Sequence, residues 1–159
     1  MKRGGGPWFG ILAATLLVVP SLSGCAHFVI LHDPLSASEH SDLGVVYETQ
    51  GELELAAREY HRALRLDSGD ARTRVNLGNV EAARGRWRRA ENAYRRALRD
   101  STTNADAMNN LAIALLRQRR NLDEARSLAE RALNGAGTRD SLYRATLDEI
   151  VTAAARKRP

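Results

Sequence analysis

A chain of 159 residues is long enough for one domain, and its 43% hydrophobic and 27% charged residues are the composition of an ordinary globular protein. The single cysteine excludes an internal disulfide, and four prolines without a long polar tract leave little room for a disordered region. The formal net charge of +5 would suit an anionic partner, but Lys2 and Arg3 contribute two of these charges at the start of the chain, and without them (5 − 2) the excess is +3.

The first 24 residues have the layout of a secretory signal peptide. Lys2 and Arg3 form a short basic segment, and an apolar stretch from Trp8 to Val19 follows it. About a dozen apolar residues are too few to cross the roughly 30 Å hydrocarbon core of a bilayer, which needs about 20 residues of helix. The stretch is therefore predicted to direct export and not to remain as a membrane span.

The apolar stretch leads into the run Leu-Ser-Gly-Cys at residues 22–25, which resembles the lipobox of bacterial lipoproteins. The resemblance implies that the leader 1–24 is removed, that Cys25 becomes the lipidated N-terminus, and that residues 25–36 form a short tether. Two or more acyl chains hold a protein stably at a membrane, whereas one gives only marginal binding. Because Ala26 and not Asp follows the cysteine, the resemblance favours the periplasmic face of the outer membrane. The alternative is an ordinary signal peptide that leaves a free cysteine.

A fixed period runs through the rest of the chain. Six positions recur in register in the first two copies, with the same difference in residue number each time (78 − 44 = 34): Leu43 and Leu77, Gly44 and Gly78, Gly51 and Gly85, Ala56 and Ala90, Tyr60 and Tyr94, Ala63 and Ala97. The third copy carries one extra residue, and its matching positions are Leu111, Ala112, Ala125, Ala129 and Ala132. A fixed period of this length indicates stacked structural repeats.

The recurring small residues indicate closely packed helices. Glycine in a helix interior, as at Gly44 and Gly78, costs about 1 kcal/mol in helix propensity, so we expect these residues to let a neighbouring helix approach. Gly51 and Gly85 come at the end of that helix and suit the left-handed cap of a tight turn. In the third copy, Asn121 is predicted to take this cap position.

This pattern resembles the tetratricopeptide repeat. The resemblance implies an all-α fold of helical hairpin repeats in a short right-handed solenoid, with repeats at 37–70, 71–104 and 105–139. Residues 140–159 are predicted to supply a capping helix and a basic tail, because the last repeat would otherwise expose an apolar face. The apolar residues that indicate this helix are Leu142, Leu147, Ile150 and Val151.

No pattern of residues indicates catalysis. The four histidines are scattered through the tether and the first repeat, without a second cysteine in the chain and without the i, i+4 spacing of a metal-binding pair: they are His27, His32, His40 and His61. His40 stands where the repeat family usually has a large apolar residue, so we expect it in the core. The sequence also contains no glycine-rich phosphate loop and no nucleophile elbow. It therefore predicts a protein that is not an enzyme and that has no metal, cofactor or small-molecule substrate.

The resemblance places the binding site on the concave face, which the first helix of each repeat forms, and implies a protein or peptide segment as the partner. The expected groove residues are Val45, Glu48 and Thr49 in the first repeat, Val75, Asn79 and Ala82 in the second, and Asn109, Ile113, Leu116 and Arg117 in the third. Asn79 and Asn110 also match two positions of relatives that bind C-terminal carboxylates, but Val75 stands where that site needs a basic residue. The primary prediction is a docking or scaffolding lipoprotein of an envelope assembly such as a secretion, pilus, outer-membrane or cell-wall machine.

A dense run of arginines in the second repeat suggests an alternative function. It consists of Arg84, Arg86, Arg88, Arg89, Arg95, Arg96 and Arg99. Such a surface would bind anionic lipid or cell-wall polymer electrostatically, or it is a solvated face whose long side chains cover apolar surface. Nucleic acid is not an expected partner, because an exported protein does not meet it and no aromatic residues are interleaved to stack on bases.

Overall fold

The computed structural model describes residues 33–135 and 137–157. The predicted signal peptide, the lipobox with Cys25 and most of the predicted tether lie outside the described residues. The described part is all-α. Its elements are α1 (Ala37–Thr49), α2 (Leu53–Leu66), α3 (Ala71–Ala83), α4 (Trp87–Asp100), α5 (Ala105–Arg117), α6 (Leu122–Asn134), the 3-10 helix η1 (Gly137–Arg139) and α7 (Asp140–Lys157).

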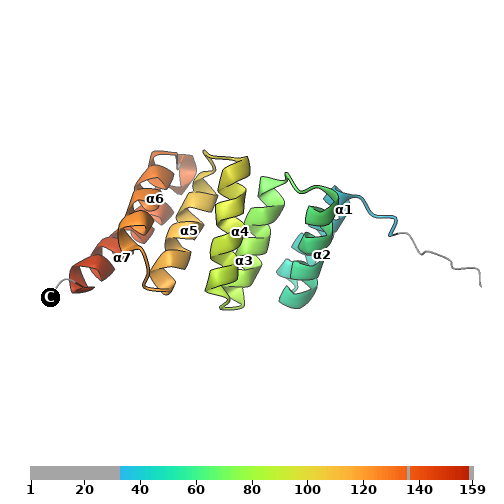
Figure 1. Ribbon diagram of the computed structural model, residues 1–159, viewed down its shortest axis with the longest axis horizontal. Helices are drawn as coiled ribbons and strands as arrows, with labels where there is room; N and C mark the ends of the chain where they lie inside the picture. Colours follow the sequence, from blue (N-terminus) through green and yellow to red (C-terminus); the bar gives the residue numbers. More distant parts are fainter. Residues whose placement is uncertain (1–32, 136, 158–159) are drawn as a thin grey trace, which may run out of the picture. The chain divides into compact units, whose positions relative to one another are not determined.

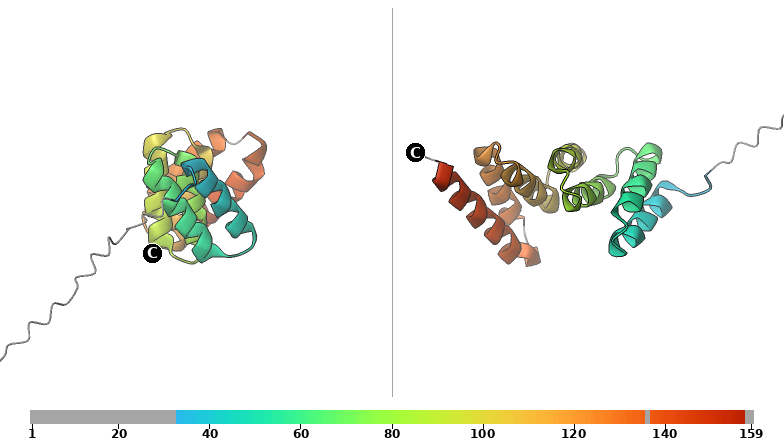
Figure 2. Two further views of the ribbon diagram at one scale, coloured as in Figure 1. Left: turned by 90° about the vertical axis from the view of Figure 1, so that its right-hand side faces the viewer. Right: turned by 90° about the horizontal axis from the view of Figure 1, so that it is seen from below.

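The helices follow one another in chain order as antiparallel pairs, α1 with α2, α3 with α4 and α5 with α6 (Figures 1 and 2). Successive first helices also contact each other, since α3 touches both α1 and α5, and α5 touches α7. The odd-numbered helices therefore form one continuous layer. No helix in the ranges 33–135 and 137–157 is both long enough and apolar enough to cross a membrane.

The first helix of each pair begins at a capping side chain, and these caps recur at the period of the repeat. Ser36 caps α1 and forms a reciprocal capping box with Glu39. The side chains of Asp70 and Asn104 accept hydrogen bonds from backbone N–H groups in the first turns of α3 and α5. Such caps satisfy the N–H groups that a helix start leaves without a partner, at about 0.5–2 kcal/mol each.

The turn inside each pair uses a residue in the left-handed region directly after the helix cap. Gly51 has a φ of +76° and Gly85 a φ of +70°, the conformation expected for both. In the third pair the equivalent residue is Arg119, with a φ of 53°. The prediction that Asn121 takes this position is wrong: Asn121 also has a positive φ of 46°, but it is the residue before α6 in a turn one residue longer.

Each helical glycine makes room for a tyrosine of the second helix in its own pair. A Cβ atom on Gly44 would lie 2.5 Å from Cε1 of Tyr60, and one on Gly78 would lie 2.3 Å from Cε1 of Tyr94. Both rings are buried. In the third pair, Ala112 and Ala129 replace the glycine and the tyrosine, and both are fully buried.

The buried apolar residues form two clusters. One joins α2 to part of α3 and includes Tyr60, and the other extends from α3 to α7 and includes Tyr94. Helix α7 contributes Tyr143 and Ile150 to the second cluster, and Leu147 packs against it.

The apolar face predicted for α7 is partly wrong. Leu142 is 56% exposed and Val151 43% exposed. The buried face instead runs through Tyr143, Thr146 and Ile150, at the i, i+3, i+7 spacing of one helix side.

Candidate functional site

The first helices of the three pairs place equivalent side chains on one face. The same position of the three repeats carries Val45, Asn79 and Ile113 on α1, α3 and α5. A cavity of about 270 Å³ opens on this face between α3 and α5. It is lined by Asn79, Ala82, Ala83, Trp87, Tyr94, Asn110 and Ile113.

A hydrogen-bond network fixes the amide at the floor of this cavity. Oδ1 of Asn79 accepts a hydrogen bond from the Tyr94 hydroxyl and another from Nδ2 of Asn110, each at 2.9 Å. Asn109 in turn donates to Oδ1 of Asn110 at 3.3 Å. Since the carbonyl of Asn79 is saturated by two donors, its Nδ2 group is left to donate elsewhere, and no hydrogen bond from it is made to the described residues.

This arrangement suits the backbone of a peptide. An oriented N–H₂ group offers donors to a carbonyl oxygen, and the methyl groups of Ala82 and Ala83 with the side chains of Trp87 and Ile113 supply an apolar bed around it. Grooves that hold peptides combine such apolar area with a few fixed polar groups.

A second polar contact on this face lies in the first repeat. The Tyr60 hydroxyl donates to Oε2 of Glu48 at 2.7 Å. Burial raises the pKa of the Tyr60 and Tyr94 phenols well above the ordinary value of 10.0, and the Glu48 carboxylate raises both further. Both hydroxyls therefore stay protonated and act as donors at neutral pH.

The structure brings some of the predicted groove residues to the cavity and leaves others apart from it. Asn79, Ala82 and Ile113 line it. Val45, Glu48 and Thr49 lie on α1, outside the cavity lining, and the Thr49 hydroxyl is taken up by the Val46 carbonyl. Arg117 is exposed at the end of α5 and pairs with Glu149 of α7 at 3.1 Å.

Three predicted groove residues are core residues instead. Val75 is 8% exposed, Asn109 2% and Leu116 7%. Val75 and Asn109 occupy the same repeat position, one residue before Asn76 and Asn110, and one residue on a helix turns a side chain by about 100°. Leu116 packs in the apolar cluster that continues into α7.

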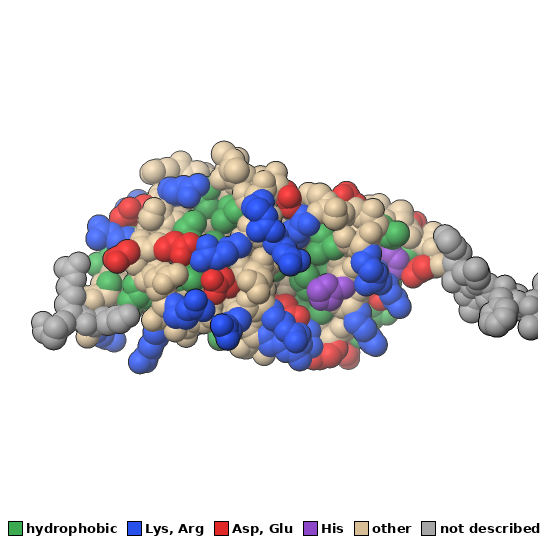
Figure 3. Space-filling view, in the orientation of Figure 1, with side chains coloured by type: hydrophobic (Ala, Val, Ile, Leu, Met, Phe, Trp, Pro, Cys, Tyr) green, Lys and Arg blue, Asp and Glu red, His purple; other side chains and the backbone are tan. Residues whose placement is uncertain are grey.

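The predicted basic surface is smaller than the sequence suggests. Arg84 is mostly buried between Glu81 at 3.2 Å and Glu54 at 2.5 Å, and Arg95 is bound by Glu91 and Glu124. Within the described part of the chain, four of the predicted residues form no ion pair: Arg88, Arg89, Arg96 and Arg99. Lys and Arg side chains gather with apolar surface between them over the region of α2 and α4 (Figure 3).

Comparisons with known proteins agree with this architecture. The first tetratricopeptide repeat domain of Spaghetti, bound to an HSP90 peptide, superposes with a TM-score of 0.71 at 20% identity, covering 76% of this chain and 94% of that chain. The type III secretion translocator chaperone SycD of Yersinia enterocolitica superposes with a TM-score of 0.68 at 19% identity, covering 74% and 85%. Residues 75–141 match the family model of the tetratricopeptide repeat. The fold is a tetratricopeptide-repeat solenoid.

One curated relative matches a shorter stretch. Type IV pilus assembly protein PilF of Pseudomonas aeruginosa is 41% identical over 58 residues, which are 36% of this chain and 23% of PilF. The chain thus corresponds to about a quarter of that protein. The solved structures are similar to this chain in fold, and one of them, the Spaghetti domain, is bound to a peptide.

Two histidines, His40 and His61, lie in the tetratricopeptide repeats, and they differ in burial. His40 is buried, with Nδ1 2.8 Å from Glu59 and Nε2 3.3 Å from Asp33, so it lies in the core as expected. His61 is exposed on α2, and burial of part of its ring lowers its pKa. Within residues 33–135 and 137–157, no group of three or more His, Cys, Asp or Glu side chains is arranged to hold a metal ion.

The sequence assigns no role in the site to three residues that contribute to it. Trp87 and Ala83 line the cavity beside Asn79, and Tyr94 orients the amide from below. Tyr94 is assigned only to packing by the repeat pattern. Its second role depends on the position of its hydroxyl, which a period in the sequence does not reveal.

Proposed function

We propose that this protein is a lipid-anchored docking module that holds a peptide segment of a partner in the concave groove between α3 and α5. The observation that carries the proposal is the oriented Asn79 amide, whose carbonyl accepts from Tyr94 and Asn110 and whose N–H₂ group makes no hydrogen bond to the described residues. Structural neighbours support a peptide as the ligand, since Spaghetti is bound to an HSP90 peptide and SycD to a peptide of the translocator YopD.

The proposed cellular setting is an assembly of the bacterial cell envelope. The run of residues 22–25 supports removal of the leader 1–24, lipidation at Cys25 and a tether over 25–36, which would hold the repeats at the periplasmic face of the outer membrane. The match to PilF favours a pilus or a related machine within this class.

The groove is tested best by Asn79→Asp. An aspartate keeps the oxygen that accepts from Tyr94 and Asn110, so the network and the fold are preserved, but it replaces the N–H₂ donor by a negatively charged oxygen. Asn134→Asp at the exposed end of α6 makes the same change in charge away from the cavity and serves as the control.

A photo-crosslinking residue at Ala83, which is exposed and lines the cavity, would capture the partner in cells. We expect one discrete protein to crosslink, to be lost in Asn79→Asp and to be kept in Asn134→Asp. Crosslinking that is unchanged by Asn79→Asp, while the melting curve is also unchanged, would refute the groove as the binding site.

The anchor is tested separately by Cys25→Ser. We expect the wild-type chain to fractionate with outer membranes and the variant to lose membrane association. Wild-type protein that is soluble after cell lysis, or a variant that stays in the membrane fraction, would contradict the lipoprotein assignment without bearing on the groove.

A further inference from the structure

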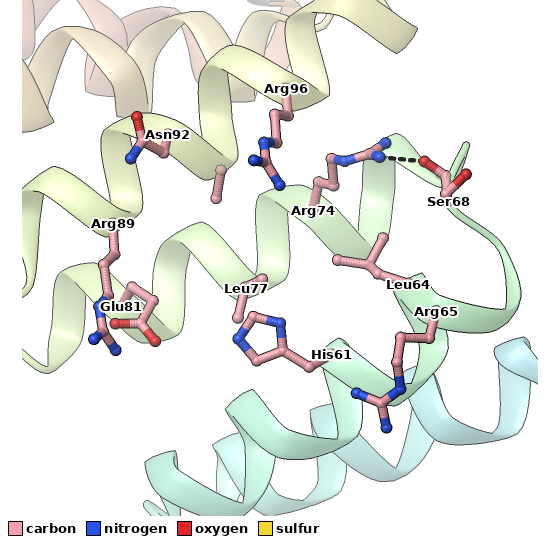
Figure 4. A pocket seen from close by; sticks show the side chains of 11 residues that line it. His61, Leu64, Arg65, Ser68, Arg74, Leu77, Glu81, Arg89, Asn92 and Arg96 are labelled. Atoms are coloured by element: carbon pink, nitrogen blue, oxygen red, sulfur yellow. Dashed lines mark hydrogen bonds between the residues drawn. The ribbon is translucent and has the colours of Figure 1, made fainter.

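A second groove lies in the other helix layer, between α2 and α4 and above α3 (Figure 4). Its volume is about 530 Å³. Its floor is apolar and consists of Leu64, Leu77 and Ala93. The residues on its two sides are mostly basic or polar: His61, Arg65 and Ser68 from α2 and the turn after it, and Arg89, Asn92 and Arg96 from α4. We call this site the α2–α4 groove.

The same place in the next junction of the solenoid differs from the α2–α4 groove, and the first difference is an ion pair. His61 and Arg89 face the α2–α4 groove from opposite sides. Their equivalents one repeat later are Arg95 and Glu124, which form two hydrogen bonds across the junction, at 2.6 Å and 3.0 Å. A histidine and an arginine offer no such pair, so the sides of the α2–α4 groove are not drawn together.

The second difference is the size of the side chains. Ala93 is replaced one repeat later by Leu128, and Glu81 by Leu115, and both leucines are buried in the apolar cluster. The repeat frame therefore accommodates leucine at both places. The α2–α4 groove is open because of its own side chains and not because of the fold.

Several polar groups of the α2–α4 groove have no ion-pair or hydrogen-bond partner among the described residues. Within the described part of the chain, Arg65, Arg89 and Arg96 form no ion pair, whereas Arg74 is held by Asp100 and the Ser68 carbonyl. Glu81 is 3% exposed and lines the groove, and its Oε1 accepts from Arg84 at 3.2 Å. Its Oε2 has no hydrogen-bond partner among the described residues, and Nη1 of Arg86 lies 3.8 Å from it, beyond hydrogen-bond distance. A buried acceptor without a partner costs about 1–3 kcal/mol.

We propose that the α2–α4 groove is a second docking site, which binds an acidic peptide segment of a partner protein. Carboxylates of the segment would pair with Arg65, Arg89 and Arg96, an apolar side chain would cover the floor, and a backbone N–H would donate to Oε2 of Glu81. This combination separates a peptide from the other anions. Phosphate, polyphosphate and phosphatidylglycerol headgroups satisfy arginines, but they bring neither an apolar side chain for Leu64 and Leu77 nor an N–H donor for a buried carboxylate.

The proposal goes beyond the concave groove and is independent of it, because the two sites share no lining residue. It is tested on the purified full chain with a fluorescein-labelled peptide of three Glu-Leu units, blocked at both ends so that no terminal carboxylate contributes. Fluorescence anisotropy measures the Kd, and a Gln-Leu peptide of equal length shows how much of the affinity requires the carboxylates.

The repeat supplies a matched pair of double variants. Arg65→Gln with Arg96→Gln removes two cations from the α2–α4 groove. Arg99→Gln with Arg131→Gln removes two exposed arginines from the equivalent positions around the next junction, so the net charge changes equally. We expect the first pair to weaken binding of the Glu-Leu peptide about tenfold, the order expected for two exposed ion pairs, and the second pair to weaken it by less than about twofold.

A third variant tests the cavity without changing charge. Ala93→Leu places the side chain of Leu128 at the equivalent point of the α2–α4 groove, where we expect it to fill the floor and abolish binding while the circular dichroism spectrum stays that of wild type and the melting temperature does not fall. Asn79→Asp should leave binding of the Glu-Leu peptide unchanged.

Three results would overturn the proposal. Equal weakening by the two double variants would mean that the peptide senses only the general positive surface. Unchanged binding to the folded Ala93→Leu variant would place the peptide elsewhere. Absence of peptide binding, together with binding of polyphosphate or of phosphatidylglycerol vesicles that depends on Arg65 and Arg96, would make the site one for an anionic polymer or a lipid surface.

Discussion

The close contact between Gly78 and Tyr94 predicts that Gly78→Ala lowers stability when residue 94 is tyrosine and raises it when residue 94 is alanine. A Cβ atom on Gly78 would lie 2.3 Å from Cε1, 2.7 Å from Cδ1 and 2.8 Å from Cζ of the Tyr94 ring, far inside the carbon–carbon contact distance of about 3.5–4.0 Å. The ring has little freedom to retreat, because it is buried and its hydroxyl is bonded to Asn79.

The expected magnitude combines two opposing effects. Overpacking of this kind costs about 1–3 kcal/mol, and a contact this short belongs in the upper half of that range. Replacing a glycine by alanine inside a helix returns about 1 kcal/mol of helix propensity. We therefore expect Gly78→Ala to lower the free energy of unfolding by about 1–2 kcal/mol in the wild-type background.

In a Tyr94→Ala background the ring is gone, and only the propensity gain remains. There Gly78→Ala should raise the free energy of unfolding by about 1 kcal/mol, which gives a coupling energy of about 2–3 kcal/mol between the two sites. The third repeat already has this combination, since Ala112 and Ala129 are the equivalent residues and both are fully buried.

The four proteins of this cycle are compared by urea denaturation followed by circular dichroism. Because Tyr94→Ala alone is expected to cost about 3–5 kcal/mol, all four are measured in the same concentration of trimethylamine oxide, which strengthens folding of each. If Gly78→Ala changes the free energy of unfolding by the same amount in both backgrounds, the two residues are not coupled and the Tyr94 ring does not clash with the added methyl group.

Two further predictions concern the helix turns and one ion pair. Arg119→Gly should stabilise the protein by about 0.5–1 kcal/mol in thermal or urea denaturation, because a left-handed conformation strains a residue with a side chain. Gly85→Ala at the equivalent position, with a φ of +70°, should destabilise it by about 1 kcal/mol, and effects of the same sign at the two positions would contradict this. The hydrogen bond from Arg95 lowers the pKa of Glu124 from 4.5, so its stabilising contribution is present above that pH and is lost as the pH falls through the lowered folded-state value. Arg95→Gln should therefore reduce the loss of stability measured between about pH 6 and about pH 3, and an unchanged loss would show that the pair does not stabilise the fold.

The repeated part of the fold could be predicted from the sequence because repeat contacts are local. Gly44 and Tyr60, or Gly78 and Tyr94, are near each other in the chain and touch within one helix pair. A period in small and large residues therefore carries their geometry. The caps Ser36, Asp70 and Asn104 obey the same period, and a comparison of these three polar residues would have marked the start of each first helix.

The candidate site could be predicted only in part, because it depends on the direction in which each side chain leaves its helix and on partners that are distant in the sequence. The repeat register assigns Val75 and Asn109 to the groove one residue away from Asn76 and Asn110, and one residue turns a helix position by about 100°. The run of arginines assigns Arg84 to a basic surface, but the carboxylate of Glu54, 30 residues earlier, neutralises it. Neither effect is visible in residue types along a single stretch.

The two junctions of the solenoid differ in a way that the fold does not require. Stability in stacked repeats is a sum of terms for each repeat and for each pair of neighbours. The apolar core divides near the first junction, where Leu77 belongs to the cluster of the first repeat and Val75 to the cluster of the others. Leucine at the positions of Glu81 and Ala93 would add apolar contacts there, as Leu115 and Leu128 do at the second junction.

An alanine and a buried carboxylate in place of two leucines therefore weaken the contact between the first and second repeats. They leave a groove in which Arg65, Arg89 and Arg96 form no ion pair with the described residues. If the α2–α4 groove had only a structural role, filling it with a leucine side chain would raise the stability of the fold without removing any binding. Ala93→Leu separates the two cases, because a more stable variant that still binds the Glu-Leu peptide would reduce the groove to a packing defect. A variant that is more stable and no longer binds the peptide would show that the open junction lowers stability but is needed for binding.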